Sequence, residues 1–159
     1  MIWLRTLCFA LTFVATALVL LPLWVVGWQR GERIFASSLA AAGIVPLALG
    51  VALMLWCWWD FAVRGRGTPA PFDPPRALVI AGPYRYVRNP MYIAAGLVLL
   101  GEAAIFGAPR LLLYGLAFAA VAHSFVVLYE ERTLRRRFGA DYDTYRAAVH
   151  RWLPAPPRR

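Results

Sequence analysis

The chain has 159 residues, the length of one domain, and 61% of them are hydrophobic while only 16% are charged. Soluble globular chains average roughly 45–50% apolar and about 25% charged residues, so the composition indicates a chain solvated largely by lipid. The low charge content excludes a disordered chain, and the presence of only two cysteines excludes a disulfide-stapled secreted domain. The net charge of +9 comes from arginines at the ends of apolar runs, which favours a membrane over nucleic acid.

The apolar runs predict an all-α integral membrane protein with about four transmembrane helices in one membrane domain over residues 1–159. About 20 apolar residues are needed to cross a hydrocarbon core of roughly 30 Å. The third run is the shortest, and Glu102 interrupts it. The predicted spans are about residues 6–29, 34–60, 90–107 and 110–129.

The arginines predict the orientation of these spans. With four spans, fourteen arginines fall on one side of the membrane, and only Arg30, Arg33 and Arg110 fall on the other. The positive-inside rule therefore places both termini, the loop at 64–89 and the tail at 130–154 in the cytoplasm. Because the chain is rich in alanine and arginine and has no lysine, we expect a multi-pass protein of a bacterial inner membrane.

The predicted cytoplasmic loop at 64–89 has two parts. Its first part is rich in glycine and proline, which favours extended geometry. Its second part turns apolar and aromatic, so we expect it to pack against lipid headgroups or over a pocket.

The tail predicts two short helices. Gly139 is suited to end the first, on which Glu131 and Arg135 are spaced to form a pair, and Asp141 is suited to start the second. A basic amphipathic helix beside a membrane normally lies on anionic lipid. Its apolar face would contain Tyr142, Tyr145, Val149 and Trp152.

The most specific string is GPYRYVRNPMY at residues 82–92. Together with the pair Glu130-Glu131 and the tail pattern Phe-Gly-x-x-Tyr-x-x-Tyr at residues 138–145, it resembles the isoprenylcysteine carboxyl methyltransferase family. That family is related to the integral-membrane phospholipid methyltransferases. The resemblance covers about residues 68–154 and requires all three patterns in order.

The resemblance implies an S-adenosylmethionine-dependent methyltransferase, with the cofactor bound between the cytoplasmic loop and the C-terminal amphipathic helix. It names no catalytic residue, and no metal is expected. The cofactor-binding residues that it implies, with Arg88 added on chemical grounds, are Arg76, Ala77, Leu78, Val79, Tyr84, Arg88, Asn89, Pro90, Met91, Tyr92, Glu130 and Glu131.

Two positions depart from the family's pattern. Most relatives have histidine where this chain has Asn89, so a role that needs an imidazole is lost here. Eukaryotic prenylcysteine enzymes have an arginine about one turn before the glutamate pair, where this chain has Val126 and Val127. The second departure weakens a prenylcysteine carboxylate as the substrate more than it weakens methyl transfer.

The chemistry of the cofactor agrees with these residue types. Glu130 or Glu131 is suited to pair with its ammonium, and Tyr84 or Tyr92 to face its sulfonium. Arg88, or the backbone N–H groups at the start of the third span, is suited to hold its carboxylate. Two structural alternatives stay open: the glutamates could form a solvated helix end, and Asn89 with Pro90 could simply start a helix.

We expect a lipophilic acceptor that enters from the bilayer, either a small molecule or a lipidated one. Carboxyl O-methylation needs no base, whereas an amine must first lose a proton. Glu102 and His123, which lie within the predicted spans, could in principle accept that proton. The alternatives are a phospholipid amine N-methyltransferase and a non-enzymatic membrane protein whose basic tail binds lipid.

Overall fold

The computed structural model describes residues 11–12, 14–27, 38–65 and 77–156. Within these ranges the chain is helical and contains no strand, which confirms the all-α class. The elements are a π-helical segment at Val14–Leu20, α2 (Leu21–Val26), α3 (Ser38–Asp60), a π-helical turn at Phe61–Gly65, a 3-10 turn at Gly82–Arg85, α4 (Pro90–Phe106), α5 (Pro109–Phe125), a π-helical turn at Val126–Glu130, α6 (Glu131–Phe138) and α7 (Ala140–Ala148).

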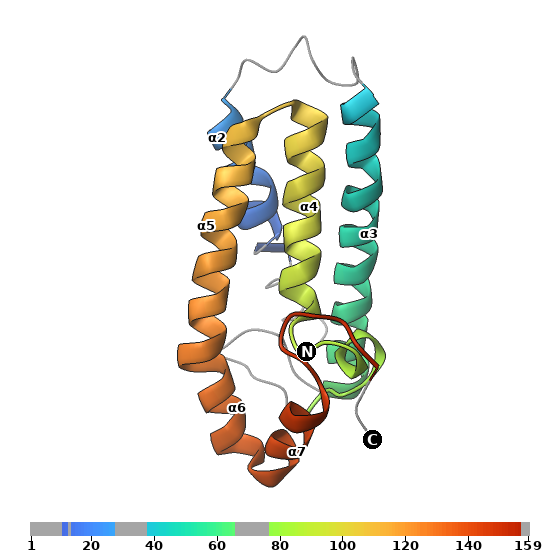
Figure 1. Ribbon diagram of the computed structural model, residues 1–159, viewed down its shortest axis with the longest axis vertical. Coiled ribbons are helices and arrows are strands. Elements are labelled where there is room, and N and C mark those ends of the chain that lie inside the picture. The colour runs from blue at the N-terminus through green and yellow to red at the C-terminus, as the bar shows by residue number, and fades with distance from the viewer. Residues whose placement is uncertain (1–10, 13, 28–37, 66–76, 157–159) are drawn as a thin grey trace.

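The helices form a bundle with its polar segments gathered at one end. Helix α4 lies between α3 and α5, and α2 packs against α5 (Figure 1). The buried core between them includes Leu18, Met54, Ala94 and Leu99. Helices α6 and α7 lie at the lower end of the view, together with the segment that leads into α4 (Figure 1). The loop and the tail therefore meet at the same end of the bundle.

Two of the described helices are long and apolar enough to cross a membrane. The first is the 26-residue stretch Ala40–Gly65, which comprises most of α3 and the π-helical turn after it. The second is the 30-residue stretch Pro109–Phe138, which comprises α5, the following π-helical turn and α6. Each contains an 18-residue window of mean hydropathy 2.1. The helical stretches Ala15–Val26 and Pro90–Phe106 are apolar but shorter. The four-span topology and its orientation thus stay predictions. Residues 6–10, 13 and 28–29 of the first predicted span and residues 34–37 of the second lie outside the described part of the chain.

Prolines and a glycine set helix boundaries, and the sequence predicted those at Pro90 and Gly139. Pro90 and Pro109 occupy first helical positions, where the missing N–H costs nothing. Gly139 separates α6 from α7 with a φ of 52°, as expected for a C-terminal glycine. Helix α7, however, ends at Ala148, because Val149 is extended with φ −122° and ψ 131°. Val149 and Trp152 therefore lie beyond the helix whose apolar face they were predicted to share.

Glycines allow α3 and α4 to approach closely, and this contact carries a stability prediction. A Cβ added to Gly50 would lie 2.7 Å from the Ala94 carbonyl oxygen and 2.8 Å from the Val98 nitrogen. Because backbone atoms cannot move aside cheaply, we expect Gly50→Ala to cost about 1–3 kcal/mol by overpacking. Gly96→Ala is the matched control, since a Cβ there meets nothing within 4 Å.

Thermal unfolding in detergent micelles measures both variants. We expect a lower midpoint for Gly50→Ala and an unchanged or slightly higher one for Gly96→Ala, because alanine favours a helix over glycine. Equal midpoints for the two variants would contradict the close approach of α3 and α4.

Candidate functional site

The segment that leads into α4 is folded tightly against the end of α3. Gly82 opens the 3-10 turn with a φ of 54°, and Tyr84 within the turn is buried. The Tyr84 ring packs edge-on against Phe61, with ring centroids 5.5 Å apart. Burial raises the pKa of the Tyr84 phenol well above its usual value, so the phenol stays protonated and can only act as a neutral hydrogen-bonding group.

Gly82 faces a buried carboxylate, which yields a second prediction. Asp60 is 1% exposed; its Oδ1 pairs with Arg64 at 3.0 Å, and its Oδ2 has no hydrogen-bond partner among the described residues. A Cβ on Gly82 would collide with this Oδ2. Gly82→Ala therefore adds a collision to the strain of a positive φ, whereas Gly107→Ala, at φ 58° with nothing within 4 Å, adds the strain alone.

We expect Gly82→Ala to be about 1–3 kcal/mol less stable than Gly107→Ala. Thermal unfolding of both variants in the same detergent measures the difference. If Gly107→Ala were the less stable of the two, the contact between Gly82 and Asp60 would be wrong.

The chain after α7 is fixed along the loop by backbone hydrogen bonds. The Arg88 N–H donates to the His150 carbonyl at 2.9 Å, and the Ala155 N–H donates to the Tyr86 carbonyl at 3.0 Å. Asn89 stands at the N-cap position of α4, but its side chain makes no capping bond. It donates instead from Nδ2 to the Arg151 carbonyl at 3.1 Å. The prediction of Asn89 as a helix start is thus right in position, and its amide holds the tail.

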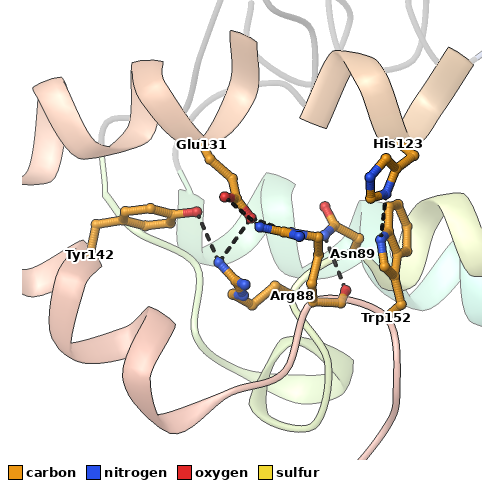
Figure 2. Close-up of polar contacts among 7 residues, drawn as sticks. Arg88, Asn89, His123, Glu131, Tyr142 and Trp152 are labelled. Carbon is orange, nitrogen blue, oxygen red and sulfur yellow. Dashed lines mark hydrogen bonds and ion pairs between the residues drawn. The ribbon is translucent and has the colours of Figure 1, made fainter. Parts of the chain in front are cut away.

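Glu131 is the centre of a buried charge cluster that joins α6, the loop and the tail (Figure 2). Its two oxygens accept hydrogen bonds from Arg151 Nε at 2.7 Å and Arg151 Nη2 at 3.0 Å. Arg88 Nη1 lies 3.0 Å from Glu131 Oε1 and donates to the Tyr142 hydroxyl at 3.4 Å. The side chains of Arg88 and Glu131 are only 10% and 11% exposed. The two hydrogen bonds from Arg151 form the bidentate arrangement in which arginine binds a carboxylate most strongly.

The electrostatics of this cluster fix its charges. Burial alone would raise the pKa of Glu131, but the hydrogen bond from Arg151 and the charge of Arg88 outweigh it and hold the pKa below the usual value. The hydrogen bond to Glu131 likewise raises the pKa of Arg151. The predicted pairing of Glu131 with Arg135 is wrong, because Arg135 turns to Asp143 on α7 with its Nε 3.2 Å from Oδ2. Glu131 is therefore ionised, and the positive charges of Arg88 and Arg151 already balance its negative charge.

Glu130, the neighbouring glutamate, has a different environment. The Tyr92 hydroxyl donates to Glu130 Oε2 at 3.2 Å, and among the described residues no arginine pairs with this carboxylate. Tyr92 also contacts the Trp152 ring edge-on, with centroids 6.3 Å apart. Trp152 in turn donates from its indole nitrogen to His123 Nδ1 at 3.1 Å (Figure 2). Burial raises the pKa of Glu130 above its usual value, so Glu130 is the glutamate of the pair that no arginine neutralises within the described part of the chain.

Two cavities flank these contacts. The α4–α5 cavity has a volume of about 390 Å³ and is lined by Tyr92, Ile93, Gly96, Phe118, Ala119, Ala122, His123 and Trp152. The loop–α7 cavity has a volume of about 710 Å³ and is lined by Ala77, Leu78, Ile80, Arg85, Phe138, Asp141, Thr144, Tyr145, Ala148 and Val149. Both volumes fall in the range of small-molecule sites, roughly 300–1,000 Å³.

The structure distributes the predicted cofactor residues between these cavities. Ala77 and Leu78 line the loop–α7 cavity, and Tyr92 lines the α4–α5 cavity. Between them lie Val79, Tyr84, Asn89 and Pro90, which are buried, and Met91, which packs against the core. Arg88 and Glu131 pair with each other, and Glu130 bonds Tyr92. Arg76 lies outside the described residues.

The sequence predicted no role for Arg151, and it predicted Tyr145 only on the apolar face of the second tail helix and in the tail pattern. Arg151 completes the Glu131 cluster, and Tyr145 donates from its hydroxyl to the Tyr84 carbonyl at 2.8 Å. The spacing of Tyr142 and Tyr145 did predict a shared face on the second tail helix, but the face covers the loop. Glu102, by contrast, lies twelve residues beyond Pro90 on α4, roughly 18 Å along the helix axis, and so away from this end.

Comparison with known proteins agrees with the resemblance drawn from the sequence. The sequence model of the phospholipid methyltransferase family matches residues 39–141, which run from the start of α3 into α7 and include the string at 82–92 and both glutamates. This family stands in the same group as the isoprenylcysteine carboxyl methyltransferases. No curated protein and no solved structure matches the chain. Because the match covers more than half of the residues, the chain belongs to the phospholipid methyltransferase family.

Proposed function

We propose that the protein is a membrane methyltransferase that transfers the methyl group of S-adenosylmethionine to the head group of a lipid. The family is one of methyltransferases, and its description names phospholipids. The observation that supports the proposal most is the convergence of loop and tail at one end of the bundle. There Glu131 is neutralised by two arginines, whereas the one hydrogen bond that Glu130 makes to a described residue comes from Tyr92.

The residues present fit the cofactor. S-adenosylmethionine carries a carboxylate, an ammonium and a sulfonium, so its site needs groups of both charges and aromatic or apolar walls. Arg88 Nε is buried and has no hydrogen-bond partner among the described residues, so it has a donor to offer a carboxylate. Burial raises the pKa of Glu130, and a bound cation would favour its ionised form, so Glu130 would supply the negative charge when the cofactor binds. The loop–α7 cavity adds Arg85 and Asp141 with the Tyr145 ring.

When bound, the cofactor supplies an electrophilic methyl group, and its transfer is a direct displacement that depends on alignment. In this proposal Glu130 holds the cofactor's cationic side, while the Glu131 cluster keeps the loop and tail in place around it. The α4–α5 cavity receives the acceptor, because its lining is almost entirely apolar and it opens between two helices with exposed apolar faces. Exclusion of water from such a site favours a reaction in which charge is neutralised.

Two acceptors stay open within this proposal. A carboxylate would yield a methyl ester and needs no base, and the sequence string that resembles the prenylcysteine enzymes favours it. A phospholipid amine would yield an N-methyl product, and the description of the matched family favours it. The non-enzymatic alternative predicts no cofactor binding.

Titration calorimetry with S-adenosylmethionine on detergent-solubilised protein tests the cofactor. Labelled methyl transfer to a bacterial total lipid extract tests the reaction, and alkaline hydrolysis of the product separates esters from N-methyl groups. We expect saturable binding and a labelled lipid. A folded sample that neither binds the cofactor nor labels any lipid would refute the proposal and favour the non-enzymatic alternative.

A further inference from the structure

His123 and Trp152 form a hydrogen-bonded pair at the edge of the α4–α5 cavity. His123 comes from α5 and Trp152 from the tail, 29 positions later in the chain, and both line the cavity. The ring centroids are 6.0 Å apart, and the indole nitrogen lies 3.1 Å from His123 Nδ1 (Figure 2). The other lining residues are apolar except for Tyr92. The pair therefore supplies most of the polar atoms of an otherwise apolar site.

The chemistry of the indole group fixes the protonation of His123 in this contact. The tryptophan Nε1–H is a donor only, so the His123 Nδ1 that it contacts must be the unprotonated acceptor. A neutral imidazole with an acceptor at Nδ1 carries its proton on Nε2. The two ring nitrogens point in diverging directions, so the Nε2–H faces away from Trp152. In this state His123 offers a neutral donor and is not a base.

The pair is also connected to the charged end of the proposed site. Trp152 contacts the Tyr92 ring, and Tyr92 donates to Glu130. Arg151, the residue before Trp152, is held by Glu131. Trp152, which fixes the tautomer of His123, is thereby connected through Arg151 and Tyr92 to the two glutamates. A ligand in the α4–α5 cavity would have its polar end beside Tyr92, Trp152 and His123.

We propose that His123 is an acceptor-binding residue whose Nε2–H donates a hydrogen bond to an oxyanion at the head of a single-chain lipid, and that Trp152 is the positioning residue that selects this tautomer. The proposal rests on the proposed function for the identity of the cavity as the acceptor site. A neutral donor favours an oxygen acceptor and disfavours an ammonium head, which carries only donors. A volume of about 390 Å³ is near the lower end of the range for ligand sites, which suits one chain.

Equilibrium binding of two probes of equal chain length tests the head-group preference. The probes are radiolabelled palmitate and radiolabelled hexadecylamine, each titrated against the full-length protein in detergent micelles without cofactor. We expect palmitate to bind about tenfold more tightly or better, since a hydrogen bond to a charged group has that size. Equal affinity for the two probes, or tighter binding of hexadecylamine, would overturn the proposal.

Two substitutions of His123 then separate hydrogen bonding from packing. Gln retains an acceptor for Trp152 and an N–H donor, so His123→Gln should keep palmitate affinity within about threefold, whereas His123→Phe should lose about tenfold or more. His123 is exposed on α5, so neither variant should unfold, and thermal unfolding checks this. Palmitate affinity unchanged in His123→Phe would overturn the proposal, as would an equal loss in both variants.

The role of Trp152 has a spectroscopic readout. In ¹⁵N-histidine-labelled protein near pH 8, the His123 resonances should report the Nε2–H tautomer, and Trp152→Phe should shift them towards a tautomer mixture. Unchanged resonances in Trp152→Phe would refute the role of Trp152.

The binding and spectroscopic measurements do not use S-adenosylmethionine. A protein that binds palmitate through His123 but transfers no methyl group would therefore disprove only the proposed function. Methyl transfer with full activity in His123→Phe would disprove only this inference.

Discussion

Replacing Glu131 by glutamine is expected to destabilise the protein by about 3–5 kcal/mol, the usual cost of removing one partner from a buried ion pair. Both arginines lose their anion in this variant, and the Arg88 side chain is only 10% exposed. Glutamine fills the same volume, so packing loss contributes little. An uncompensated buried guanidinium is the dominant cost. Thermal unfolding in detergent, followed by circular dichroism, measures it.

Asp143→Asn is the matched control, because it removes a carboxylate from an ion pair that is exposed. Arg135 and Asp143 have side chains 60% and 41% exposed, so their pair is worth about 0–1 kcal/mol at most. A Glu131→Gln protein as stable as Asp143→Asn would show that the cluster around Glu131 is solvated.

The same cluster predicts how stability depends on pH. Because the folded-state pKa of Glu131 is lowered, the stabilisation is fully present above the unfolded pKa of about 4.3 and is lost as pH falls through the lower folded value. Wild-type protein should therefore lose stability below roughly pH 4, and Glu131→Gln should lose less over the same interval. Parallel curves for the two proteins would show that other carboxylates carry the acid transition.

The helices of this protein follow from local sequence signals. Pro90 and Gly139 could be placed at helix ends from the sequence because a missing N–H and a free positive φ are properties of single residues. The all-α class follows from apolar runs that are too long for strands. By the same argument, the length of a run gives a helix but does not establish that the helix crosses a membrane.

The site was less accessible from the sequence because its contacts are tertiary. Glu131 and Arg135 have helical spacing, yet Arg151, twenty residues away, takes the glutamate, since the tail returns to the loop after α7. Asn89 was correctly placed at a helix start, but only the structure shows that its amide holds the Arg151 carbonyl. The two adjacent glutamates could not be told apart by sequence. The arginines around one of them distinguish a structural carboxylate from an available one.

That distinction leads to the sharpest functional prediction, for Glu130→Gln. Glutamine retains an oxygen that accepts from the Tyr92 hydroxyl but has no charge, so the fold should survive while affinity for S-adenosylmethionine falls about 10- to 150-fold. That range corresponds to about 1.5–3 kcal/mol, the size of a hydrogen bond to a charged group. Asp143→Asn, which also removes one carboxylate from this end of the chain, should bind the cofactor like wild type.

Titration with S-adenosylhomocysteine identifies which cation of the cofactor Glu130 holds. The product retains the ammonium but has a neutral thioether in place of the sulfonium. If Glu130 pairs with the ammonium, Glu130→Gln should weaken cofactor and product by the same factor. If it faces the sulfonium, only the cofactor should lose affinity. Undiminished affinity for both would remove Glu130 from the site, and the ion-pair cluster around Glu131 would then be the only role left for the glutamate pair.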